Sequence, residues 1–198
     1  MPQDSTDKAT GKLFADIAQT PAGQSLARRL ERGGAHSFSG IAVSAQPFFA
    51  ALVHNLFPHR QLVLVAENLK LQESFQQDLE TWLNVLRNAE CGMRNETAAP
   101  TAILQSPASP LFYPAWQALP HEDKLPHADV ISDRLQTLIA LSDKSAVHTP
   151  HYALVVTSVA ALLQKTFPPG ELQDRMRKFR PGDKIAPLDL IDWLEAQG

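Results

Sequence analysis

Apolar side chains along the chain alternate between strand-like and helix-like spacing. The runs FSGIAVSA and QLVLVAE are short, and each is followed by a stretch in which apolar residues recur every three or four positions. The run YALVVTSVAALLQKTF repeats this order, with a strand through Val156 and a helix that Thr157 or Ser158 could cap. Strands that alternate with helices predict an α/β fold with a parallel sheet between two helical layers.

The remaining patterns divide the chain further. The segment KLFADIAQTPAGQSLARRLERGG predicts two short helices that are broken at Pro21 and end at Gly33 and Gly34. The run QLVLVAE is continuously apolar, which is typical of a strand covered on both faces. Residues 87–110 contain turn-forming residues and predict a loop around a short strand at AILQ.

Three prolines stiffen the stretch FYPAWQALPHEDKLPHADVISDRLQTL. Pro114, Pro120 and Pro126 each lack an amide donor and bias the preceding residue away from helix, so the segment is expected to run extended over the surface. Asp129 can then cap or charge-stabilise a helix. The positions that this helix is expected to bury are Ile131, Leu135, Leu138 and Ile139. The stiff segment before the helix would fix the direction in which the helix starts.

A parallel sheet of this kind places a phosphate loop in the turn after its first strand, and that turn reads Ser44, Ala45, Gln46 and Pro47. A phosphate loop needs glycines for close backbone approach and a lysine that reaches the phosphates. This turn has neither. The pair Gly11 and Lys12 precedes any predicted strand, so its match to the motif is accidental. The topology suits a nucleotide site, but the glycines and the lysine that would bind the phosphates are missing from this turn.

Composition narrows the class of protein. The net charge of −3 over 198 residues provides no broad basic field for nucleic acid, and DNA binding by this chain is not expected. Cys91 is the single cysteine, which excludes an internal disulfide and a zinc site built on several thiolates. A polar N-terminus and the lack of a long apolar run indicate neither export nor membrane insertion. We therefore expect a cytoplasmic protein without a membrane partner.

From about Phe38 to its end, the chain resembles the N-terminal module of bacterial transcription-repair coupling factors, which is similar to the helicase component of the bacterial excision-repair system. The positions that carry the resemblance are Pro114, Trp116, Leu119, Pro120, Pro126, Ile131, Arg134, Leu135 and Leu138, then Val155, Val156, Thr157, Leu162, Leu163 and Gln164. In that family the module keeps the layout of a nucleotide-binding domain but has lost its phosphate loop. Only HEDKL separates Pro120 from Pro126, so the DNA-gripping hairpin of the excision-repair helicase is absent.

The resemblance implies a non-catalytic scaffold with no cofactor of its own. The family's whole chain is an ATP-dependent DNA translocase that uses ATP and magnesium, displaces stalled RNA polymerase and recruits the excision-repair damage sensor. The implied organisation is N-terminal helices over 1–34, a degenerate nucleotide-binding-like α/β domain over 35–169, and the truncated start of a second small α/β domain over 170–198. That second domain, which binds the damage sensor, would begin with a strand, a turn at Gly182 and a helix.

The chemically suggestive residues all have simpler interpretations. His121, Glu122, Asp123 and His127 could ligate a metal, but a proline-bounded loop of solvated polar residues is favoured. Trp116 is favoured as a core residue over a base-stacking platform.

Two groups of cationic residues also have simpler, non-functional interpretations. Arg134 is expected to form ion pairs with Asp129 and Asp133. The basic cluster, defined as Arg175, Arg177, Lys178 and Arg180, is offset by acidic neighbours and is expected to be a solvated face. No catalytic residue can be named. The alternative is a small independent α/β protein with its own ligand or enzymatic activity.

Overall fold

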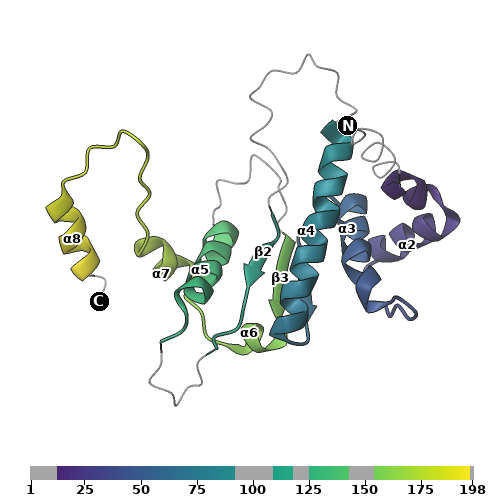
Figure 1. The fold of residues 1–198 in the computed structure, drawn as a ribbon, viewed down its shortest axis with the longest axis horizontal. Coiled ribbons are helices and arrows are strands. Elements are labelled where there is room, and N and C mark those ends of the chain that lie inside the picture. Colours follow the sequence, from purple (N-terminus) through teal and green to yellow (C-terminus); the bar gives the residue numbers. More distant parts are fainter. Residues whose placement is uncertain (1–12, 92–108, 118–124, 143–153, 197–198) are drawn as a thin grey trace, which may run out of the picture.

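The computed structural model describes residues 13–91, 109–117, 125–142 and 154–196. Three strands form one parallel sheet: β1 (Leu62–Ala66), β2 (Leu111–Tyr113) and β3 (Leu154–Ser158). The order is β1-β3-β2, so the last strand in sequence is the central one (Figure 1). The sheet is narrow, and both of its outer strands have a free edge within the described chain.

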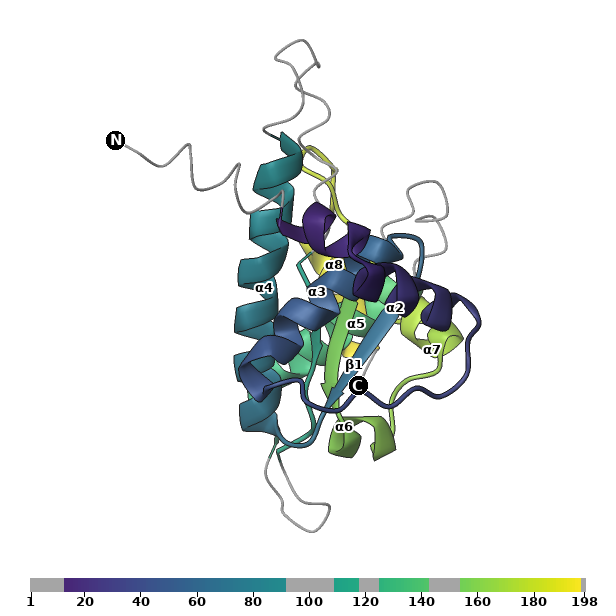
Figure 2. The same cartoon turned by 90° about the vertical axis from the view of Figure 1, so that its right-hand side faces the viewer.

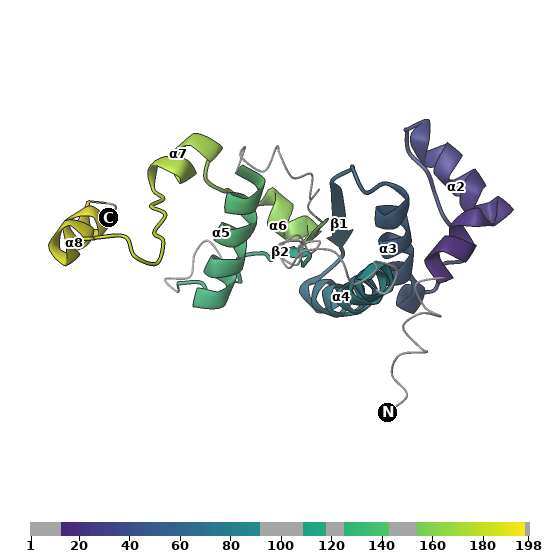
Figure 3. The ribbon, with the colours of Figure 1, turned by 90° about the horizontal axis from the view of Figure 1, so that it is seen from above.

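Helices cover the sheet on two sides. α3 (Gln46–Leu56) and α4 (Leu69–Cys91) lie on one side of the strands, and α5 (Ala128–Ser142) lies on the other (Figure 3). The central strand follows this division, because Leu154 and Val156 belong to the core cluster on the α3–α4 side whereas Val155 packs with Tyr113 on the other. The expected mixed α/β fold with a parallel sheet is confirmed.

The N-terminal helices follow the predicted pattern. Residues 13–19 are helical, and α2 (Pro21–Glu31) follows at once, with Thr20 accepting a hydrogen bond from the Gly23 amide at 3.0 Å. Gly33 has a φ of 70°, a left-handed conformation that glycine adopts readily and that ends the helix. Phe14 is almost completely buried in the core beside α3 and α4. The first helix therefore contributes directly to the core of the sheet domain.

The first predicted strand is absent. Residues 35–42 form no strand, a single 3-10 turn, η1 (Val43–Ala45), follows, and α3 then begins at Gln46. Gly40 adopts a φ of 82°, which breaks an extended run, and Val43 is 66% exposed. The run thus buries no apolar face that would favour its pairing in a sheet.

The prediction that QLVLVAE is covered on both faces is also wrong. β1 alternates between half-buried and exposed positions, with Val63 53% and Val65 49% exposed. β1 is an edge strand, and the apolar cluster under α5 contains no residue of β1. Figure 2 shows β1 and β3 side by side above α6. Continuous apolarity therefore indicated a strand but not its place in the sheet.

The middle of the chain differs from the predicted loop. α4 continues to Cys91, so residues 87–91 are helical, while the expected strand at AILQ lies outside the described residues. The segment expected to run over the surface instead supplies β2, and Pro114 after it is fully buried. This segment joins the sheet because the backbone of Phe112 and Tyr113 pairs with β3.

The C-terminal part begins with α6 (Val159–Leu163), which Ser158 caps by accepting a hydrogen bond from the Ala161 amide at 3.3 Å. α7 (Pro169–Asp174) packs on α5, with the Gln173 amide group donating to the Ser142 carbonyl. α8 (Pro187–Glu195) follows a turn at Gly182. The expected strand is absent from residues 175–186.

The contact of α7 with α5 ties residues 169–174 to the sheet domain, and the proposed division of the chain at 169/170 stays a prediction. Within the described segments, every helix is too short or too polar to cross a lipid bilayer.

Candidate functional site

A cavity of about 760 Å³ lies at the carboxyl end of β1, between η1, the first turn of α3 and α4. Its position is the one at which parallel α/β sheets bind ligands. Three residues of the expected phosphate turn line it, namely Ser44, Gln46 and Pro47, and Ala45 is the residue that precedes α3. The structure thus brings the turn to the predicted end of the sheet, although the strand expected before it is missing.

The chemistry of this cavity is unsuited to phosphate. Glu67 and Asp78 line it, and none of the described lining residues is lysine or arginine. The first turn of α3 has no side-chain cap, and Pro47 removes one of the amide donors that would point at an anion. Most of the remaining described lining is apolar: Val43, Leu64, Val65, Ala66, Leu71, Phe75 and Val156. Two carboxylates in a largely apolar hollow repel an anion and favour a neutral or cationic group.

A second cluster surrounds Arg134 on the opposite side of the sheet. The Arg134 side chain is only 1% exposed, and its guanidinium lies 4.1 Å from the Tyr113 ring centroid and 4.3 Å from that of Trp116. Its Nη1 donates to the Pro114 carbonyl at 2.7 Å, and its Nη2 donates to the Tyr113 hydroxyl at 2.6 Å. Arg134 therefore joins α5 to the chain at the end of β2.

Gln164 completes this cluster from the end of α6. Its Oε1 accepts the Trp116 amide at 2.6 Å, and its Nε2 donates to the Trp116 carbonyl at 3.3 Å. The structure thus brings together Pro114, Trp116 and Arg134 from the resemblance-derived set. Pro126 lies at the entry to α5, outside these contacts, and Pro120 lies outside the described residues. The half-buried Trp116 ring stacked on Arg134 agrees with the interpretation of Trp116 as a core residue.

The ion pairs expected for Arg134 are wrong. Arg134 forms no salt bridge with Asp129 or Asp133 in the described chain, because its side chain points into the sheet. Asp129 instead lies 3.2 Å from His127 Nδ1 at the surface. Burial lowers the pKa of Arg134, partly opposed by Tyr113, while burial and the charge of Asp129 raise the pKa of Asp133.

The buried polar roles of Gln72 and Thr137 were not anticipated from the sequence, and Thr157 was named only as a possible cap and as a position that carries the resemblance. The Gln72 Nε2 donates to the carbonyls of Tyr113 and Val156, both at 3.1 Å. The Thr157 hydroxyl donates to the Tyr113 carbonyl at 2.9 Å, and the Thr137 hydroxyl donates to the Phe112 carbonyl at 2.8 Å. The available sequence signal was a polar residue at a position that the helical or strand periodicity assigns to the core.

The candidate metal ligands are only partly within the described residues. His121, Glu122 and Asp123 lie outside the described residues, and the described part of the chain contains no group of three potential metal ligands.

In the basic cluster, Arg175 pairs with Glu171 at 3.2 Å, and Arg177 stacks 4.7 Å from the Trp193 ring centroid. Both contacts lie on an exposed segment, in agreement with a solvated face.

Comparison with known proteins yields one modest similarity. The chain is 28% identical over 87 residues to the transcription-repair-coupling factor of Haemophilus influenzae, and the match covers 44% of this chain and 7% of that protein. No family model matches the chain. No solved structure matches it either. The similarity supports a relationship to a transcription-repair-coupling factor over less than half of the chain.

Proposed function

We propose that this chain is the non-catalytic N-terminal module of a transcription-repair coupling factor, where it serves as a scaffold for protein contacts. The similarity to the Haemophilus influenzae protein supports the repair context. The cavity at the end of β1 is the observation that supports a non-catalytic role. It has the position of a nucleotide site but contains Glu67 and Asp78 in place of a phosphate-binding cation.

The proposal extends to the whole protein of which such a module is a part. That protein would use ATP and magnesium in a separate motor, displace stalled RNA polymerase, act on DNA and recruit the excision-repair damage sensor in the cytoplasm. The present residues would keep a degenerate helicase-like sheet whose cavity contains no phosphate-binding cation among its described lining residues. Those activities therefore need residues other than the ones described here.

Calorimetric titration with Mg-ATP tests the non-catalytic role. No saturable heat is expected, since carboxylates line the place that phosphates would occupy. Saturable binding that is abolished by Ser74→Trp, which would fill the cavity, would refute the proposal. The variant Ser132→Trp on the exposed side of α5 provides a matched control.

A genetic experiment tests the repair context independently. Deleting the gene for this protein should abolish the faster repair of ultraviolet lesions in transcribed strands and leave repair of non-transcribed strands unchanged. Equal repair rates in deleted and intact cells would contradict a role in transcription-coupled repair. Reintroduction of the intact gene is the control.

The cavity volume favours one alternative function. A volume of about 760 Å³ lies in the range of small-molecule sites, so an independent α/β protein could bind its own neutral or cationic ligand there. Thermal-shift screening with small metabolites distinguishes the two proposals. A compound that stabilises the wild type but not Ser74→Trp would support the alternative, whereas uniform absence of stabilisation favours the scaffold.

A further inference from the structure

Residues 164–174, which we call the strap, connect the end of α6 to α7 and pass beside α5. Figure 1 shows α7 next to α5, on which it packs. Residues 165–168 form neither helix nor strand, and each residue from 165 to 171 is exposed. Within the strap, Gln164 is half-buried and Leu172 is buried, while the other residues are exposed. The strap is therefore held at its two ends.

The Gln164 side chain holds the first end. It pairs with both backbone groups of Trp116, because its Oε1 accepts the Trp116 amide at 2.6 Å and its Nε2 donates to the Trp116 carbonyl at 3.3 Å. The Arg134 Nη1 donates to the same Oε1 at 3.4 Å and to the Pro114 carbonyl at 2.7 Å. One side chain of the strap thus contacts both the chain after β2 and the arginine that joins this chain to α5.

α7 holds the second end. Leu172 is 5% exposed, and the Gln173 Nε2 donates to the Ser142 carbonyl at the end of α5 at 3.3 Å. α7 has six residues, and a helix of this length is not stable in water by itself. Its helical structure therefore depends on its contact with α5.

The middle of the strap is poorly packed. A cavity of about 270 Å³ separates it from α5, and the described lining residues are Lys165, Thr166 and Phe167 of the strap and, opposite them, Trp116, Ile131, Arg134, Leu135 and Leu138. Well-packed protein interiors contain few voids, so this part of the strap gains little dispersion energy from α5. A segment with exposed residues and few buried contacts belongs to the part of a protein that opens most easily.

We propose that the strap opens and closes on α5 as one unit, and that its opening releases the backbone of Trp116. Ordering the exposed residues 165–171 costs conformational entropy that the contacts of one end alone do not offset, so the two ends dock together. In the open strap, the amide and the carbonyl of Trp116 bond to water instead of Gln164. Residues 175–196 follow the strap directly, so this device makes the order of the chain after β2 depend on the position of the C-terminal segment.

Native-state hydrogen exchange of the full chain, followed by nuclear magnetic resonance at low urea concentrations, tests the coupling. The amides of Trp116 and Leu172 should share one free energy of opening and one urea dependence, and both quantities should be smaller than those of Val156 in β3. Separate values for Trp116 and Leu172 would overturn the proposal. A value for Trp116 equal to that of Val156 would overturn it as well, because Trp116 would then exchange only when the sheet unfolds.

Two substitutions test the coupling from either end. Leu172→Ala should raise the exchange rates of the Leu172-position and Trp116 amides by the same factor, at least about tenfold, although Leu172 lies in α7 and Trp116 follows β2. Gln164→Ala is a milder change and should raise both rates by about tenfold. An unchanged Trp116 rate in Leu172→Ala would contradict opening as one unit.

A matched control is Gln136→Ala, which removes an exposed side-chain hydrogen bond to Ser132 on α5 and should leave both rates unchanged. Circular dichroism checks that each variant is folded.

Discussion

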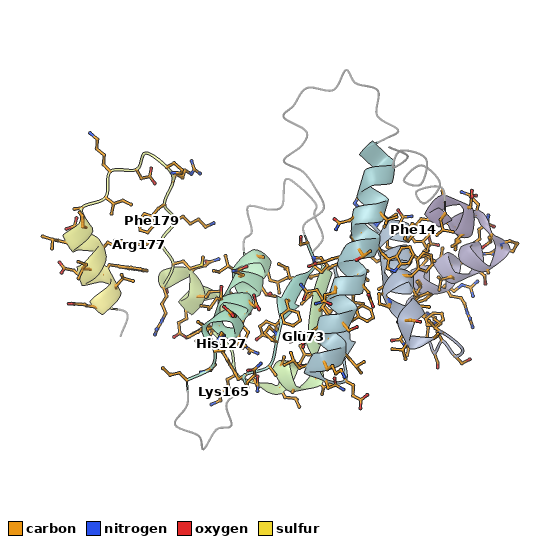
Figure 4. The ribbon with its side chains drawn as sticks, viewed as in Figure 1. Phe14, Glu73, His127, Lys165, Arg177 and Phe179 are labelled. Carbon is orange, nitrogen blue, oxygen red and sulfur yellow. The ribbon has the colours of Figure 1, made fainter. Side chains whose placement is uncertain are left out.

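The apolar core between the first helix, α3 and α4 and the region around β2 are held by different interactions. On the α3–α4 side, the aromatic rings of Phe14, Phe48 and Trp82 pack together, with Phe48 4.9 Å from Trp82 and 5.0 Å from Phe14 between ring centroids. Around β2, buried polar side chains from α4, β3 and α5 bind the backbone of the strand and of the residue after it. In the view that Figures 1 and 4 share, Phe14 lies on the opposite side of α4 from β2.

The difference teaches how a three-residue edge strand is retained. The consecutive carbonyls of Phe112, Tyr113 and Pro114 accept hydrogen bonds from Thr137, from Gln72 and Thr157, and from Arg134. A strand of three residues makes few ladder bonds, so these side chains supply much of its attachment. Apolar packing stabilises the first region, while directional hydrogen bonds from helices on both faces of the sheet fix β2.

Phe14→Ala should give the largest loss of stability. Removing a ring from a well-packed core leaves a cavity and costs about 3–5 kcal/mol of unfolding free energy. Urea denaturation followed by tryptophan fluorescence measures it. Phe14→Leu, which keeps most of the apolar volume, should cost clearly less. A loss below about 1 kcal/mol for the alanine variant would show that the first helix is not part of the apolar core.

Arg134→Met should reduce the unfolding free energy by about 3 kcal/mol, since two short charge-assisted hydrogen bonds are lost while their acceptors stay buried. Arg134→Lys should recover little, because an ammonium cannot stack between two rings and bind both oxygens. The control is Arg175→Met, which removes an exposed ion pair and should cost less than about 1 kcal/mol. Equal losses for the two methionine variants would contradict the role given to directional hydrogen bonds in the region around β2.

Gln72→Met should have an intermediate effect, about 1–2 kcal/mol in urea denaturation. The substitution removes two bonds to backbone carbonyls but also removes the Gln72 Oε1, which is buried without a partner. Leu79→Met tests a conservative change in the apolar core of the same helix. Hydrogen exchange should increase in β2 for Gln72→Met and not for Leu79→Met; the reverse would contradict the role given to Gln72.

His54 should produce the smallest effect, visible only in the pH dependence of stability. Burial lowers the pKa of His54 from its ordinary value of 6.5, so the unfolded chain binds a proton more readily than the folded one. Stability should therefore decrease as the pH falls through 6.5 and level off below the lowered pKa. His54→Gln should flatten this part of the profile in denaturation curves measured across the range. An unchanged slope in the variant would assign the loss to another group.

Local patterns were sufficient for much of the fold. The break at Pro21, the helix from Gln46, the strand at β1, a cap at Thr157 or Ser158 and the strand at β3 were predicted from spacing and turn chemistry, and the structure places the cap at Ser158. These features depend on residues that lie close together in the sequence, where apolar periodicity and capping groups act directly.

Only the tertiary structure decided which polar residues are buried and which apolar residues are left exposed. Arg134 looked like an exposed helix residue, and its burial depends on the Pro114 carbonyl, 20 residues earlier in the chain, and on the Tyr113 hydroxyl. Val63 looked fully covered, and its exposure depends on β1 being an edge strand. A hydrogen-bond partner or a covering helix is brought close by the fold, and local periodicity contains no information about either. The sequence by itself therefore determined many of the elements, while strand order and long-range partners determined the rest and what all of them bury.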